Sequence, residues 1–74
     1  MKYRLDFVLR VYGKTGRIVK NALSEFGEEL EIAGGEGEGE AKDFTVCIHT
    51  EEPTLVFDAC SQLGRITSVK INEK

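Results

Sequence analysis

Gly13-Lys14-Thr15 is the first segment whose residue types could do chemistry. The same three residues end the loop that many nucleotide hydrolases wrap around phosphates, where backbone N–H groups and the lysine contact the phosphate oxygens. That loop also needs a glycine at the position of Val8. The sequence therefore excludes a nucleotide hydrolase of this type and leaves open only a weaker anion site at the start of a helix.

Such an anion site would use the positive end of a helix that begins after Thr15. Backbone N–H groups in the first turn of a helix have no partner within the helix, so they can bind an anion together with nearby cations. An ordinary strand-to-helix turn is the alternative. We expect the ligand to contact the following residues: Lys14, Gly16, Arg17 and Arg65.

Cys47 and His49 could form a nucleophile and its base, but their spacing argues against this. Residues two apart on a strand face the same way and stand roughly 7 Å apart at the backbone, so no hydrogen bond between them is forced. No pair of carboxylates has a spacing that demands general acid and general base roles. The sequence therefore predicts a protein that is not an enzyme.

Metal and cofactor sites are not indicated either. The chain has two cysteines, Cys47 and Cys60, and one histidine, so a structural zinc site would lack ligands. The glycine- and glutamate-rich run 34–40 lacks the spaced ligands of a calcium loop. We expect this run to be a flexible hairpin connection, and we expect no metal and no cofactor.

Length and composition predict one small cytoplasmic domain, 1–74. A chain of 74 residues buries only about 60% of the surface that its unfolded form exposes. No segment has the length of a signal peptide core or of a bilayer span, so no membrane partner is expected. Domains of this size often gain stability from disulfides, a metal or self-association, and only self-association is left open by these residues.

Charged residues are sorted along the chain, although the net charge is only −3. Residues 1–20 are basic except for Asp6, and residues 25–52 are acidic except for Lys42. Two interpretations follow: a basic surface for an anionic partner, or two parts of one domain that lie against each other. The fold decides between them.

Hydrophobic periodicity divides the chain into strands and helices. Alternation over 3–12, 44–49 and 66–72 predicts half-buried strands, and Leu30 and Ile32 indicate a further short one. Helical spacing over 16–26 predicts a helix of about a dozen residues, with Thr15 as its N-cap and Gly27 as a left-handed C-cap. Pro53 opens a second helix, which Gly64 closes.

The order strand, helix, strand, strand, helix, strand predicts a ferredoxin-like α+β sandwich, βαββαβ. Its antiparallel four-stranded sheet has the strand order 4-1-3-2, with both helices on one face. Right-handed crossovers bring the connections 13–16, 34–41 and 64–65 to the same end of the sheet. Lys14, Arg17 and Arg65 would gather there.

The sheet face opposite the helices would carry alternate residues of the central strands and of the last strand. We expect on it Arg4, Asp6, Val8, Arg10, Tyr12, Asp43, Thr45, Cys47, His49, Glu51, Ile66, Ser68, Lys70 and Asn72. Across the strands, Arg10 would lie near Asp43 or Thr45, and Asp6 would reach Lys70. Arg4 would lie near His49 or Glu51. Such exposed pairs contribute only some tenths of a kcal/mol, roughly, but they remove the need for an acidic partner.

Nucleic acid is a disfavoured ligand for this face. RNA-binding domains of this topology stack bases on aromatic residues of the central strands, and here only Tyr12, at a strand end, is available. The negative net charge also lacks the electrostatic footprint of nucleic-acid binding. The alternative would use Arg4, Arg10, Tyr12 and Lys70.

The layout resembles the ferredoxin-like class through residues 5–11, 18–26, 44–48, 56–63 and 66–71. It is similar to small amino-acid-sensing regulatory domains of the ACT kind, a resemblance that implies a ligand near the loop 13–16. Copper-chaperone domains share the layout but carry paired cysteines in that loop, which this chain lacks. The shared topology by itself transfers neither function.

These observations predict a non-enzymatic binding or interaction module that forms a homodimer or binds another protein. A homodimer could pack sheet on sheet, or edge to edge through the second or the last strand. The alternatives are a sensor of small anionic ligands at the loop 13–16 and the nucleic-acid binder. The predicted interaction face consists of Arg4, Arg10, Tyr12, Cys47, His49 and Lys70.

Overall fold

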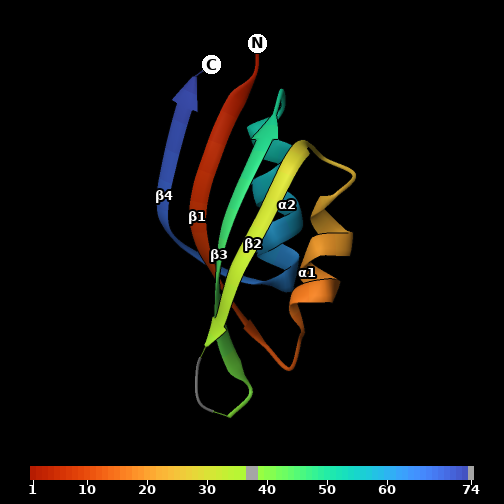
Figure 1. The fold of residues 1–74 in the computed structure, drawn as a ribbon, viewed down its shortest axis with the longest axis vertical. Coiled ribbons are helices and arrows are strands. Elements are labelled where there is room, and N and C mark those ends of the chain that lie inside the picture. The colour runs from red at the N-terminus through yellow and green to blue at the C-terminus, as the bar shows by residue number, and fades with distance from the viewer. Residues whose placement is uncertain (37–38, 74) are drawn as a thin grey trace.

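The computed structural model describes residues 1–36 and 39–73, which form one sheet with both helices on the same face (Figure 1). Residues 37 and 38, in the predicted hairpin connection, lie outside the described residues. The elements are β1 (Tyr3–Tyr12), α1 (Gly16–Leu23), β2 (Glu28–Glu36), β3 (Ala41–Thr50), α2 (Pro53–Leu63) and β4 (Gly64–Glu73). The antiparallel strand order β2-β3-β1-β4 confirms the predicted ferredoxin-like arrangement.

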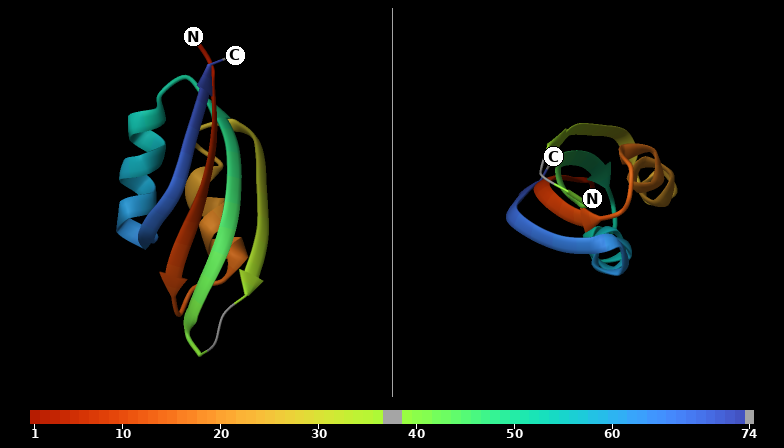
Figure 2. Two further views of the ribbon diagram at one scale, coloured as in Figure 1. Left: turned by 90° about the vertical axis from the view of Figure 1, so that its left-hand side faces the viewer. Right: turned by 90° about the horizontal axis from the view of Figure 1, so that it is seen from below.

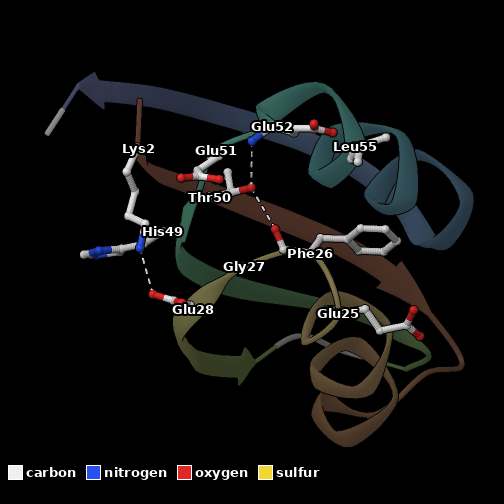
Figure 3. Close-up of a pocket in the computed structure, with 10 residues that line it drawn as sticks. All are labelled: Lys2, Glu25, Phe26, Gly27, Glu28, His49, Thr50, Glu51, Glu52 and Leu55. Atoms are coloured by element: carbon white, nitrogen blue, oxygen red, sulfur yellow. Dashed lines mark hydrogen bonds and ion pairs between the residues drawn. The ribbon is translucent and has the colours of Figure 1, made fainter.

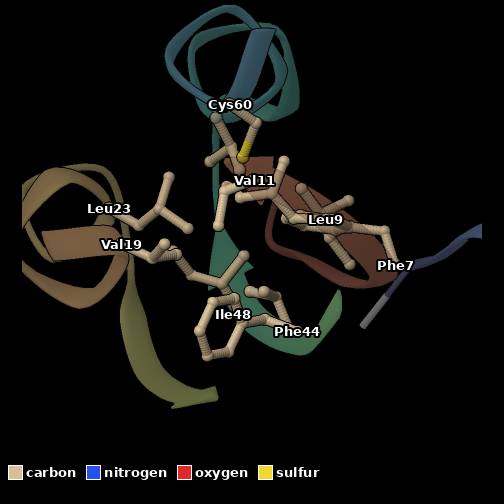
Figure 4. Packing of buried hydrophobic residues seen from close by; sticks show 11 residues of the cluster. Phe7, Leu9, Val11, Val19, Leu23, Phe44, Ile48 and Cys60 are labelled. Carbon is tan, nitrogen blue, oxygen red and sulfur yellow. The ribbon is translucent and has the colours of Figure 1, made fainter. Parts of the chain in front are cut away.

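The core lies between the sheet and the two helices, as the end-on view of Figure 2 shows. The alternation in β1 buries Leu5, Phe7, Leu9 and Val11 completely or nearly so. Side chains from both helices meet them (Figure 4), among them Val19 and Leu23 of α1 and Val56 and Cys60 of α2. The ring of Phe7 packs edge-on against Phe57, with 5.8 Å between the ring centroids. The core thus holds each helix in place along β1 and β3. In the part of the chain that is described, no helix is both long and apolar enough to cross a membrane.

Helix α1 begins as predicted but ends earlier. The Thr15 hydroxyl accepts a hydrogen bond from the backbone N–H of Ile18, so Thr15 is the N-cap. The helix stops at Leu23 with Ser24 as its C-cap, and the predicted left-handed cap at Gly27 is wrong. Gly27 precedes β2, where a Cβ atom would collide with the carbonyl oxygen of His49. The glycine is required there by a close approach of two backbones rather than by a helix end.

Gly64 has a comparable role at the other edge of the sheet. Its φ of 177° is extended, so the predicted helix cap is wrong in conformation, although the helix does end at Leu63. Gly64 is already the first residue of β4, and a Cβ atom would collide with the carbonyl oxygen of Arg10. Helix and strand therefore follow one another without a linker.

Strand β2 is longer than the sequence pattern predicted. It extends through Gly34 and Gly35, which were expected to form part of a flexible connection. Both have positive φ, 96° and 90°, and the pairing with β3 shifts register between Gly34 and Glu36. A Cβ atom on Gly35 would approach the ring of Phe44 to 2.9 Å, so the glycine makes room for a core aromatic.

A β-bulge in β4 changes which of its side chains share a face. Opposite β1, the register shifts between Asp6 and Val8, and Ser68 takes a φ of 54°. Because one residue is inserted, Ile66 pairs with Leu9 and packs on the core, so its predicted place on the open face is wrong. Arg65 pairs with Arg10 and lies on the open face instead of beside Lys14 and Arg17.

Candidate interaction surfaces

The open face of the sheet carries an ion pair between its two central strands. Arg10 lies directly opposite Asp43, and its guanidinium contacts both carboxylate oxygens, Nε to Oδ1 at 2.7 Å and Nη2 to Oδ2 at 3.0 Å. The Arg10 hydrogen bonds hold the pKa of the Asp43 carboxyl below its usual value, and the same contact raises the pKa of Arg10. The predicted proximity of these two residues is confirmed.

The other predicted residues of the interaction face share this side of the sheet. Arg4 lies opposite His49 in the register, as expected, but its guanidinium pairs with Asp6 on its own strand, at 3.2 Å. Lys70 is the register partner of Asp6. Tyr12 is 60% exposed at the end of β1. The face is therefore polar and partly neutralised by its own charges.

Cys47 and His49 lie side by side on this face, but they are not equally open. His49 is only 9% exposed, because a bulge in β2 covers it. Glu29 at that bulge has a φ of 51°, and its Oε2 lies 2.9 Å from Nδ1 of His49. Partial burial raises the pKa of the Cys47 thiol, so this sulfur is less readily ionised than a free cysteine.

A hollow of about 400 Å³ opens where β2, β3 and α2 begin or end (Figure 3). Thr50 joins these elements, because its hydroxyl donates to the carbonyl oxygen of Phe26 at 2.7 Å and accepts from the backbone N–H of Glu52 at 3.1 Å. Lys2 and Glu28 close one side with an ion pair of 2.8 Å, which lowers the pKa of Glu28. Thr50, one of the two predicted caps of the second helix, thus satisfies a backbone N–H at its start.

The predicted anion-binding residues do not converge. Gly16 and Arg17 line a hollow of about 710 Å³ between α1 and β2, with Lys20 and the edge of Phe44. Arg65 lines a different hollow, of about 170 Å³, on the open face. Lys14 lies in the turn between β1 and α1. A ligand in the loop 13–16 would therefore meet Gly16 and Arg17 but not Arg65.

The exposed apolar side chains of β4 are a surface that the sequence pattern missed. Val69 is 46% exposed and Ile71 is 52% exposed on an edge strand. Ile71 lies opposite Leu5, on the helix side of the sheet, where the helices leave it uncovered. The odd spacing of Ile66 and Ile71, with apolar residues five apart in an alternating strand, is the signal of the bulge that could have revealed this surface.

Metal-binding and nucleophilic groups do not cluster in the described part of the chain. Among those residues, no group of three or more histidine, cysteine or acidic side chains is arranged to hold a metal ion. Burial in the core raises the pKa of the Cys60 thiol to about 11, which keeps this sulfur protonated at neutral pH. The geometry supports contacts with a partner better than it supports bond-making chemistry.

Comparison with known families gives one match. The family model of the FakA-like middle domain, which is named after a fatty acid kinase, matches residues 1–73. No curated protein and no solved structure matches this chain.

Proposed function

The chain belongs to the FakA-like middle-domain family, whose name refers to a fatty acid kinase, and we propose that it is a non-enzymatic interaction module that self-associates through the edge strand β4. The observation that carries this proposal is the exposure of Val69 and Ile71 on that edge. An edge strand offers unpaired backbone groups, and apolar side chains beside them favour pairing with another strand.

The segment of β4 beyond the bulge can pair with itself about a two-fold axis at Ile71. In this antiparallel register Ile71 faces its own copy, Val69 faces Glu73, and Lys70 faces Asn72. Ile71 and Glu73 lie opposite Leu5 and Tyr3, so this face of the pair continues the helix side of the sheet. No like charges oppose each other, and the isoleucine pair is shielded from water.

The opposite edge is a poorer candidate for the same contact. Strand β2 carries Glu28, Glu29, Glu31 and Glu36 within nine residues. Two copies paired through β2 would bring glutamates together, which is destabilising, and the bulge at Glu29 would interrupt the ladder. A homodimer through β2 is therefore disfavoured relative to one through β4.

Packing of two open sheet faces is also less favourable than the β4 contact. Such a dimer would bury the Arg10–Asp43 and Arg4–Asp6 pairs, which are now about half exposed. Removing these charges from water costs more than their mutual attraction returns unless new hydrogen bonds form. The edge contact leaves both pairs in solvent.

Sedimentation equilibrium over a concentration series tests the proposal, with Ile71→Lys as the variant. We expect the wild type to shift from monomer to dimer, and Ile71→Lys to weaken the association at least about tenfold, because the two-fold axis would bring two lysines together. Ile18→Lys is a matched control, since Ile18 on α1 is 46% exposed and lies away from β4. A wild type that stays monomeric at high micromolar concentration, or equal effects of both variants, would contradict the proposal.

A further inference from the structure

Two arginines face each other across neighbouring strands of the open face. Arg10 of β1 and Arg65 of β4 are register partners, so their Cβ atoms stand about 5 Å apart. Like charges in directly opposite positions destabilise a sheet. The pair lies beyond the bulge at Ser68, away from the segment 69–73 that we assign to self-association.

Only one of the two guanidinium groups is neutralised by the residues that the structure describes. Asp43 holds Arg10 through two hydrogen bonds from Nε and Nη2, which fix the orientation of the guanidinium plane. Arg65 forms no ion pair with any described residue. Since a guanidinium has five N–H donors, donors on both side chains remain for a further acceptor.

The arginines border a hollow rather than a flat surface. Val8, Arg10, Asp43, Arg65 and Thr67 line a space of about 170 Å³. The hydroxyl of Thr67 adds a neutral donor, and Val8 forms an apolar wall. The side chain of Arg10 is 51% exposed, so a ligand can reach it from solvent.

We propose that this hollow binds a phosphate group, with Arg65 and Arg10 as its cationic contacts and Thr67 as a hydroxyl contact. Arginine suits this role because its planar fork binds phosphate oxygens through paired hydrogen bonds. A phosphate group has three acceptor oxygens and nearly two negative charges at neutral pH, so it can bridge both guanidiniums while Asp43 stays in place. A carboxylate has a single charge and would bind less well.

Amide chemical-shift mapping tests this site with inorganic phosphate, methyl phosphate and acetate, each at constant ionic strength. We expect saturable shifts at Arg10, Arg65 and Thr67 with phosphate, and binding of acetate weaker by about tenfold, the size of one lost charged hydrogen bond. Saturation by methyl phosphate with equal affinity would assign the site to a phosphate ester, and exclusion of the ester would assign it to free phosphate. Both results support a phosphate site.

Arg65→Gln is the decisive variant, because Arg65 has no ion pair in the described structure whose loss would disturb the fold. We expect it to weaken phosphate binding at least about tenfold. Arg4→Gln is the matched control, since Arg4 is on the same strand and face as Arg10 and its side chain is 52% exposed. Shifts that do not saturate, equal effects of the two variants, or shifts centred on Thr15, Gly16 and Arg17 would overturn the proposal. Because self-association is measured with Ile71→Lys, each proposal can fail without the other.

Discussion

The two edge strands, β2 and β4, meet the same structural problem in different ways. Each contains a bulge with a non-glycine residue at positive φ, Glu29 at 51° in β2 and Ser68 at 54° in β4. In β2 the bulged residue points its carboxylate at the buried His49. In β4 the bulge turns the following residues so that Val69 and Ile71 become exposed.

This difference indicates that one edge is closed and the other is available. Strand β2 is acidic and its bulge is tied to the neighbouring strand, two devices that prevent strands from adding to an edge. Strand β4 has apolar side chains where β2 has glutamates. A bulge is therefore not protective by itself, because its effect depends on which side chains it turns outward.

The largest effect is expected where each edge strand leaves its preceding turn or helix. Gly64→Ala should destabilise the protein by about 3 kcal/mol, because the new Cβ meets the backbone carbonyl of Arg10 and α2 joins β4 without a linker to absorb a shift. Gly27→Ala should cost about 2 kcal/mol, since the turn before β2 can move. Urea unfolding measures both.

Gly13→Ala is the control for the glycine variants. A Cβ atom at Gly13 meets nothing within 4 Å, and only its φ of 66° opposes the substitution. We expect a cost of about 1 kcal/mol for this left-handed conformation. If Gly64→Ala costs no more than Gly13→Ala, the tight junction at β4 is not what fixes that edge.

The two bulges should respond in opposite ways to glycine. Ser68→Gly relieves the left-handed backbone and should stabilise the protein by about 0.5 to 1 kcal/mol, since the Ser68 side chain makes no hydrogen bond with any described residue. Glu29→Gly relieves the same backbone conformation but loses the contact with His49, so we expect no gain or a net loss. Thermal unfolding of the two variants, compared with wild type, measures the difference. Equal stabilisation by both would mean that the Glu29–His49 contact contributes nothing to the closed edge.

The smallest effect concerns acid sensitivity at the two edges. Lys2 holds the pKa of Glu28 below its ordinary value of 4.5, so the contribution of this pair is present above that pH and is lost as the pH falls through the lowered pKa. Glu28→Gln should therefore lower stability slightly at pH 7 and flatten its decline below pH 4.5. Glu73→Gln on β4 is the control, because Glu73 forms no ion pair with the described residues. Urea midpoints at neutral and acidic pH that change equally in both variants would contradict this assignment.

The central strands could be predicted from the sequence because both periodicity and burial act on them in the same way. Leu5, Phe7, Leu9 and Val11 alternate without interruption, and all are buried. Thr15 also declares itself, since a hydroxyl residue before an apolar helical pattern can satisfy a free N–H. Strand order and the Arg10–Asp43 contact follow from these elements.

The edges could not be predicted in the same way, because their glycines and bulges respond to neighbouring backbones. Gly27 and Gly64 were interpreted as helix caps from their local position, whereas each is required by a strand that is distant in the sequence. The bulge at Ser68 moved Arg65 to the open face and Ile66 to the core. The candidate site was thus predicted correctly for β1 and β3 and incorrectly for β4.

The position of β4 beside β1 has a mechanical consequence. The two strands are antiparallel neighbours, and Tyr3 pairs with Glu73 at the end of the sheet where both chain ends lie (Figure 1). A pulling force applied between these two residues acts across the ladder rather than along it. The hydrogen bonds would then break one pair at a time from Glu73 toward Gly64, so the strand would peel away under low tension and carry Ile71 with it before the core is loaded.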